Sequence, residues 1–518
     1  MKRKYLSLLL AALLLVTAGC SASSGSASAP MASAPLYAMT PAEPMPGDGA
    51  TNWNTEEYNH IAENGFRAVS TSPLSTFAAD VDTASYANLR RMLNQGGDVP
   101  ADAIRLEELI NYFRYDYPEP EGDAPFSVTS EISPCPWNPD TQLLRLGLKA
   151  AEPDWEAMPK SNLVFLIDVS GSMDEYDKLP LVKQAFLLLT EHLHPGDVIS
   201  IVTYASSDRI ALDGATGDEG QTIRAAIEEL TAGGSTAGAR GIETAYALAE
   251  KHFIPDGNHR VFLATDGDLT VGLTSEGELT RLVEEKKQSG VFLSVMGFGT
   301  GNIKDNKMEA LADHGDGNYS YIDSALEARR VLVEEMGGTL FTVAKDVKLQ
   351  VEFNPERVKG YRLVGYENRL MAAEDFADDT KDGGEIGAGH RVTVLYELAA
   401  ADSAMEIPGA ELKYQEAAPT GSGEWLTLSV RYKAPDSDVS SLLEYPIGDE
   451  SRADAPSADT AFAAAVAEFG MLLRKSSYSG DATFRGVQAQ LEALPGIRED
   501  QYKDEFLYLV RQQARRAG

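Results

Sequence analysis

Residues 162–172 read Asn-Leu-Val-Phe-Leu-Ile-Asp-Val-Ser-Gly-Ser, so that an apolar run leads directly into an aspartate and two serines. An apolar run without alternation is typical of a parallel strand that is buried on both faces. Similar runs follow at 198–202, 261–264 and 291–296. Helical patterns separate these runs, near 179–193, 218–231, 238–253, 275–289 and 323–336. The alternation predicts an α/β domain with a doubly wound parallel sheet.

Polar residues that suit a metal ion lie at the ends of the predicted strands. Asp168, Ser170 and Ser172 form an Asp-x-Ser-x-Ser run directly after the first strand. Thr236 lies in a glycine-rich stretch, and Asp266 closely follows the third strand. Ligands of open parallel sheets bind at the carboxyl edge, where these segments would meet. Hydroxyl and carboxylate oxygens with little total charge suit Mg²⁺ or Mn²⁺ with an open coordination position.

This set of residues resembles the metal-ion-dependent adhesion site of the von Willebrand factor type A domain, and the resemblance covers roughly 160–340. It implies that the two serines and Thr236 would ligate the metal and that the two aspartates would bind it directly or through water. It also implies that an Asp or Glu of a protein partner completes the coordination shell. The flanks resemble those of a bacterial lipoprotein family with this domain, at 77–91, 107–113 and 361–369.

A simpler interpretation of the Asp-x-Ser-x-Ser run is a helix N-terminus. Ser172 or Asp174 could cap the helix that follows and bind nothing, because serine and aspartate are favoured at that position. Similarly, residues 265–268 could form only a tight turn. A cap by itself, however, explains neither Thr236 nor Asp266.

The N-terminus carries the pattern of a secretory signal. Lys2, Arg3 and Lys4 precede an apolar stretch at 5–16, and Thr-Ala-Gly leads into Cys20. Twelve helical residues rise about 18 Å, which is too short for a hydrocarbon core of about 30 Å. The ending resembles the bacterial lipobox, which implies that Cys20 is lipidated and that the protein is anchored, outside the cytoplasm, to the cell membrane or outer membrane.

The regions on either side of the α/β domain both alternate like strands. Before it, strand patterns lie between 126 and 148, and after it they lie at 347–353, 361–366, 392–398 and 425–432. Neither flank has enough strands to cover a sheet face alone, so we expect one β-sandwich into which the α/β domain is inserted. Helical patterns at 460–473 and 488–512 predict a helical C-terminal region. The expected divisions are a signal peptide (1–19), a flexible Ser/Ala/Pro-rich tether (20–55), an N-terminal flank (56–157), the α/β domain (158–340), a β-rich flank (341–440) and the helical region (441–518).

The composition excludes one class of partner. Among the 518 residues, Asp and Glu number 79 against 45 Lys and Arg, which gives a net charge of −34. Such a field repels a phosphate backbone, so we expect no nucleic-acid binding. With Cys20 assigned to lipid, Cys135 is expected to be a lone thiol.

A second motif supports a different function. Asp80-Val-Asp-Thr83 resembles the Asp-x-Asp-x-Thr signature of haloacid-dehalogenase-type phosphatases, which implies a metal-assisted phosphohydrolase that uses Asp80 and Asp82. The preceding residues make a poor core strand, and Asp82 or Thr83 could instead cap a helix at 84–93. We therefore expect a binding protein rather than an enzyme. A scaffold or assembly protein that binds no metal is a third interpretation.

Overall fold

The computed structural model describes residues 55–79, 82–122, 124–152, 158–235, 238–267, 276–409 and 421–517. The predicted signal peptide, Cys20, nearly all of the predicted tether, Asp80 and Thr236 lie outside these ranges. Within these ranges, no helix combines the length and the apolar content that a membrane span requires.

A six-stranded sheet forms the centre of the α/β domain, with the strand order β10-β9-β8-β5-β6-β7. All neighbouring strands are parallel except the hairpin of β6 and β7. The strands are β5 (Ser161–Asp168), β6 (Val198–Tyr204), β7 (Asp208–Thr216), β8 (Asn258–Thr265), β9 (Phe292–Phe298) and β10 (Tyr319–Ile322). The parallel sheet expected from the sequence is confirmed. Strands β7 and β10 are additional edge strands, and neither contains an apolar run from which it could be predicted.

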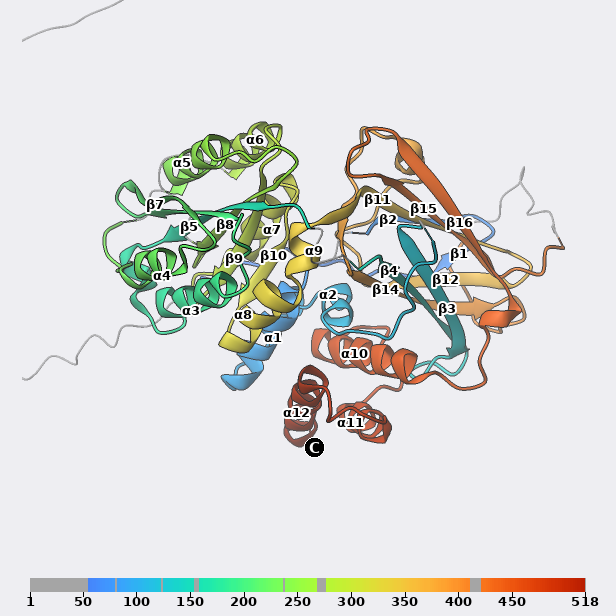
Figure 1. The fold of residues 1–518 in the computed structure, drawn as a ribbon. Coiled ribbons are helices and arrows are strands. Elements are labelled where there is room, and N and C mark those ends of the chain that lie inside the picture. Colours follow the sequence, from blue (N-terminus) through green and yellow to red (C-terminus); the bar gives the residue numbers. More distant parts are fainter. Residues whose placement is uncertain are drawn as a thin grey trace, which may run out of the picture. The chain divides into compact units, whose positions relative to one another are not determined.

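Helices cover both faces of this sheet (Figure 1). Side chains of α3 (Leu179–Thr190), α4 (Gly220–Glu228) and α8 (Ala325–Arg329) share one buried cluster with β5 and β6. On the other face lie α5 (Gly238–Lys251), α6 (Glu276–Lys287) and α7 (Asp305–His314). The sequence did not predict α7, because its apolar face is short and its first turn is polar. Shorter segments are the 3₁₀ turn Gly171–Asp174, the π-helical Arg330–Glu334 and α9 (Met336–Leu340).

The N-terminal flank completes this domain. Helix α1 (Ala84–Asn94) lies beside the edge strand β10, and Ala84 and Ala87 belong to the same buried cluster as Val164 and Leu263. Because α1 covers apolar side chains of the sheet, the α/β domain shares its core with residues outside 158–340.

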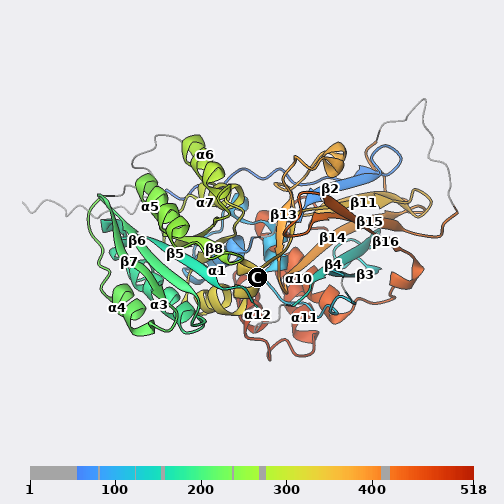
Figure 2. The same ribbon diagram turned by 45° about the horizontal axis from the view of Figure 1, so that its top comes forward.

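The two flanks together build the predicted β-sandwich (Figure 2). One sheet has the order β1-β12-β14-β4-β3, and the other has β13-β11-β15-β16, with β2 paired to β11. The strands are β1 (Arg67–Ala68), β2 (Leu74–Ala78), β3 (Phe126–Pro134), β4 (Gln142–Ala150), β11 (Thr342–Phe353), β12 (Val358–Val364), β13 (Gly384–Gly387), β14 (Arg391–Ala400), β15 (Leu426–Lys433) and β16 (Ser440–Ile447). Because β4 pairs with β14 and β2 with β11, both sheets combine strands from before and after the α/β domain.

The C-terminal region differs from its prediction in two details. Strand β16 lies where the helical region was expected, because this edge strand contains Pro446 and exposes Leu442, so it lacks an apolar pattern. The helix expected at 488–512 is two helices, because Pro495 and Gly496 interrupt it. The helices are α10 (Ala458–Arg474), α11 (Phe484–Ala493) and α12 (Gln501–Arg516); 3₁₀ turns span Ala101–Ala103, Ala373–Ala377 and Asp449–Ser451.

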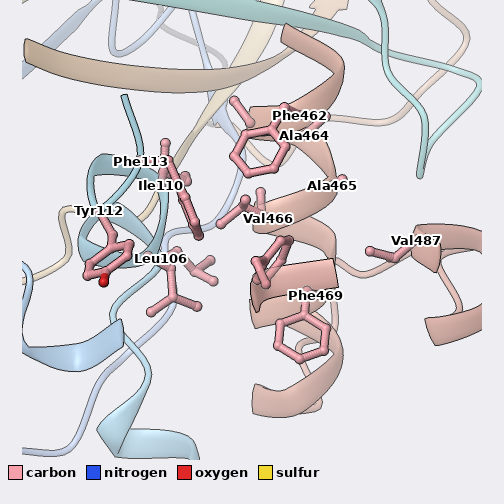
Figure 3. Close-up of a cluster of buried hydrophobic side chains, with 14 of the residues drawn as sticks. Leu106, Ile110, Tyr112, Phe113, Phe462, Ala464, Ala465, Val466, Phe469 and Val487 are labelled. Atoms are coloured by element: carbon pink, nitrogen blue, oxygen red, sulfur yellow. The ribbon is translucent and has the colours of Figure 1, made fainter. Parts of the chain in front are cut away.

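An aromatic cluster joins α10 to α2 (Leu106–Asn111) of the N-terminal flank (Figure 3). Phe462 lies edge-on to Phe113, with ring centroids 4.9 Å apart, and Val466 and Phe469 belong to the same buried cluster. Cys135 is a free thiol in this cluster, and burial raises its pKa to about 12. The C-terminal helices therefore share a core with the N-terminal flank.

Glu468 on α10 should make stability depend on pH. It is 2% exposed, and burial raises the pKa of its carboxyl from 4.5 to about 7. The folded chain thus binds this proton more tightly than the unfolded chain, so stability falls as pH rises from about 4.5 to about 7. We expect Glu468→Gln to be more stable than wild type at pH 8 by about 3 kcal/mol, and equally stable at pH 4. Urea unfolding at both pH values measures this, with Glu499→Gln at an exposed position as the control. A difference that is the same at both pH values would contradict it.

Candidate metal centre

The Asp-x-Ser-x-Ser run lies at the carboxyl edge of β5, between the parallel neighbours β6 and β8. Asp168 is the last residue of β5 and is fully buried. Its Oδ1 accepts a hydrogen bond from the backbone N–H of Ser170 at 2.8 Å. The hydroxyl oxygens of Ser170 and Ser172 are 3.0 Å apart. The run thus presents a carboxylate and two hydroxyls together.

Two further segments meet this run. The backbone N–H of Gly171 donates to the carbonyl oxygen of Gly234 at 2.9 Å, and Gly233 donates to Val169 at 2.7 Å. The segment that leads to Thr236 is therefore held against the run, although Thr236 itself lies outside the described residues. Asp266, directly after β8, is 1% exposed and acts electrostatically on Asp168.

The contacts of the two serines differ from those of a helix cap. The N-cap residue of the 3₁₀ turn Gly171–Asp174 is Ser170, and that of α3 is Lys178; neither side chain makes a capping hydrogen bond. Ser172 is therefore not the N-cap of either segment. A tight turn does follow β8, because Gly267 has φ +101° and its N–H donates to the Thr265 hydroxyl at 3.2 Å. This turn is compatible with a role of Asp266 at the candidate site.

Lys178 also belongs to this site, although no sequence pattern pointed to it. Its Nζ lies 2.9 Å from Asp266 Oδ2 and donates to the carbonyl oxygen of Ser172, also at 2.9 Å. The side chain is only 8% exposed. A lysine in a polar loop before a helix is ordinarily solvated, so its burial follows only from the tertiary structure.

The electrostatics of Asp168 fit a cation. The pKa of its carboxyl is raised to about 7, mainly by burial and in smaller part by the nearby Asp266, whereas hydrogen bonds from Ser170 and Tyr204 act in the opposite direction. The Oδ2 atom is buried and makes no hydrogen bond of ordinary geometry within the described residues. Such an oxygen is costly to bury without a partner. A divalent cation held by Asp168, Ser170 and Ser172 would supply one, with Asp266 and Thr236 beside it. Across the described ranges no group of three or more His, Cys, Asp or Glu is suited to a metal.

Three family models match consecutive parts of the chain. "von Willebrand factor" matches residues 52–145, "von Willebrand factor type A domain" matches 162–335, and "Uncharacterized protein YfbK, C-terminal" matches 338–515. Protein YfbK of Escherichia coli (strain K12) is 42% identical over 472 residues, which cover 89% of this chain and 81% of that protein. The chain belongs to the YfbK family of von Willebrand factor type A domain proteins.

Other similarities are more distant. Inter-alpha-trypsin inhibitor heavy chain H1 of Sus scrofa is 27% identical over 197 residues, or 36% of this YfbK-family chain and 22% of that protein. The solved structure "von Willebrand factor type A from Catenulispora acidiphila" has 15% identity and a TM-score of 0.38, over 79% of this chain and 81% of that one. The ArnB paralog VWA2 from Sulfolobus acidocaldarius has 15% identity and a TM-score of 0.34, over 75% and 97%.

The second motif makes contacts of its own in this YfbK-family chain. Asp82 Oδ1 accepts a hydrogen bond from the backbone N–H of Tyr319 at 2.8 Å, and Oδ2 lies 3.3 Å from Arg369. The Thr83 hydroxyl accepts from Arg330 at 2.7 Å, and Thr83, the N-cap of α1, makes no capping hydrogen bond. Thr83 therefore does not cap α1 through its side chain, and the contacts of Asp82 and Thr83 tie the start of α1 to β10 and to Arg330. These contacts favour a structural role for Asp82, whereas Asp80 lies outside the described residues.

Proposed function

We propose that this chain binds a protein partner through a divalent cation, Mg²⁺ or Mn²⁺, at the carboxyl edge of β5. Ser170, Ser172 and Thr236 hold the cation, and Asp168 and Asp266 supply negative charge. An Asp or Glu of the partner takes the open coordination position. Membership in the von Willebrand factor type A domain family, which often mediates protein–protein interaction, supports this function.

One observation carries the proposal. The Oδ2 atom of Asp168 is buried at the carboxyl edge of a central strand and makes no hydrogen bond of ordinary geometry within the described residues, although the Tyr204 hydroxyl lies near this carboxyl and lowers its pKa. Two hydroxyls lie on the same turn, 3.0 Å from each other. A carboxylate that caps a helix or forms a structural ion pair would have its oxygens satisfied. A carboxylate oxygen that binds a cation would have no hydrogen-bond donor when the cation is absent.

The surroundings of the site favour a short-range interaction. The chain carries a net charge of −34, which repels an acidic partner at a distance. Attraction must therefore come from the cation and from direct contacts. Tyr176 lies between the two serines and α3 and is 82% exposed. Exposed tyrosines are common at the centre of interfaces, because the ring buries a large area with little loss of side-chain entropy.

The proposal includes the location of the protein. Lipid on Cys20 would anchor the chain to the cell membrane or outer membrane, outside the cytoplasm. The Ser/Ala/Pro-rich segment after Cys20 would act as a tether that holds the binding site away from the lipid surface.

Metal-dependent capture from whole cells tests the proposed function. We expect the purified full chain to bind Mg²⁺ or Mn²⁺ in calorimetry, and to capture a cross-linked partner in Mg²⁺ but not in chelator. Tyr176→Ala should bind the metal like wild type and capture about tenfold less partner, since an interface aromatic commonly contributes more than 1 kcal/mol. Tyr508→Ala, at another exposed tyrosine, is the matched control.

Two results would contradict the proposal. If the wild-type chain binds no divalent cation, or captures the same partner equally well in chelator, the metal-independent scaffold interpretation takes its place. Turnover of a phosphate ester that is lost in Asp80→Asn and kept in Asp168→Ala would instead support the phosphohydrolase.

A further inference from the structure

Lys178 places a fixed positive charge inside the metal centre. Its ammonium lies 2.9 Å from Asp266 Oδ2, and both side chains are almost fully buried. The same ammonium donates to the carbonyl oxygen of Ser172, the second serine of the Asp-x-Ser-x-Ser run. Lys178 therefore contacts two of the three segments that form the site.

The fold makes room for this side chain. Gly299 has φ +76°, and a Cβ there would lie 2.4 Å from Cγ and Cε of Lys178. The aliphatic stem thus packs against the backbone at Gly299, just after β9. The ammonium at its end reaches Asp266 and the Ser172 carbonyl oxygen. A lysine that served only solubility would not be packed in this way.

The charges of the site can be counted. When both carboxyls are ionised, two carboxylates and one ammonium give a sum of −1, and a divalent cation changes that sum to +1. Without Lys178 the sum with the cation would be zero. The ammonium therefore repels the incoming cation and competes with it for Asp266, but leaves the loaded site positive.

We propose that Lys178 sets both the metal affinity and the ligand class of this site. This inference rests on the proposed function and deepens it. As a tethered cation, Lys178 neutralises Asp266 until a divalent cation enters, and it weakens that cation's binding. Once the cation is bound, the net positive charge favours a carboxylate over a neutral oxygen ligand. The Ser172 carbonyl remains an acceptor for the ammonium when the cation attracts Asp266.

Calorimetric titration with Mn²⁺ alone, on the full chain freed of metal by chelator, tests this inference. We expect Lys178→Gln to bind Mn²⁺ at least about tenfold more tightly than wild type, because it keeps a hydrogen-bond donor and loses the charge. Lys178→Arg keeps the charge and should bind like wild type or more weakly. Lys183→Gln removes a charge elsewhere on α3, where Nζ donates to the Glu228 carbonyl oxygen at 2.9 Å, and should change nothing.

The melting temperature in chelator and in Mn²⁺ gives a second, independent measure of metal binding. In chelator, Lys178→Gln should melt below wild type, because buried Asp266 loses its counter-charge. Saturating Mn²⁺ should raise its melting temperature by more than it raises that of wild type, since tighter binding stabilises the native state more.

The possible failures are distinguishable. If neither wild type nor Lys178→Gln binds Mn²⁺, the metal site and the proposed function are both wrong. If wild type binds Mn²⁺ and folded Lys178→Gln binds it equally or more weakly, the site stands and Lys178 is only a structural or orienting residue. If Lys178→Gln fails to fold even in Mn²⁺ while Lys178→Arg folds, the lysine is a structural counter-charge and the inference is overturned.

Discussion

Replacing Arg105 with methionine should destabilise the protein by about 3–5 kcal/mol. The guanidinium donates to Glu108 at 2.8 Å, to Asp305 at 2.5 Å and to Glu309 at 2.8 Å, and all four side chains are buried. Without the guanidinium, Glu108 of α2 and Asp305 of α7 lose this counter-charge, whereas Glu309 of α7 keeps Arg369 at 3.3 Å. Because these helices belong to the N-terminal flank and to the α/β domain, the loss should weaken their junction. Urea unfolding of the full chain, followed by circular dichroism, measures the change.

Arg431→Met is the matched control for this prediction. Arg431 pairs with Asp379 at 3.0 Å, but both side chains are partly exposed. An exposed pair contributes about 0–1 kcal/mol, so this variant should unfold almost like wild type. Equal destabilisation by the two variants would show that the burial of Arg105 does not determine its contribution to the free energy of unfolding.

Asp168→Asn should abolish the response of the protein to metal. The amide keeps the shape of the side chain and can still accept the hydrogen bond from Ser170, but it brings no charge to a cation. In wild type, Mg²⁺ at a hundred times its dissociation constant should add about 2.7 kcal/mol to the free energy of unfolding. We expect this gain, measured by urea unfolding with and without Mg²⁺, to disappear in the variant, and partner capture to be lost with it.

The behaviour in chelator separates this prediction from simple misfolding. Burial disfavours the charged form of Asp168, so its neutral replacement should be at least as stable as wild type at pH 8. Asp213→Asn removes an equal charge at an exposed pair with Lys251 and should keep the full Mg²⁺ response. A normal Mg²⁺ response in Asp168→Asn would show that the cation binds elsewhere.

The sequence by itself determined the class of the fold. Strands β5, β6, β8 and β9 are buried on both faces, so each appears as an apolar run that needs no knowledge of its neighbours. The interrupted sandwich followed because neither flank could cover a sheet alone. Elements with exposed or short apolar faces were missed, namely β7, β10, β16 and α7, since their place is decided by edges and by partners distant in the sequence.

The candidate site divides in the same way. Asp168, Ser170 and Ser172 are two residues apart, so chain connectivity alone keeps them together at the end of a strand. Asp266 could be placed because parallel strands end at a common edge. Lys178 could not be placed from the sequence. Its contact with Asp266 spans 88 positions and depends on the lack of a side chain at Gly299. Only the packing of distant segments determines whether such a charge is buried in the site or exposed to water.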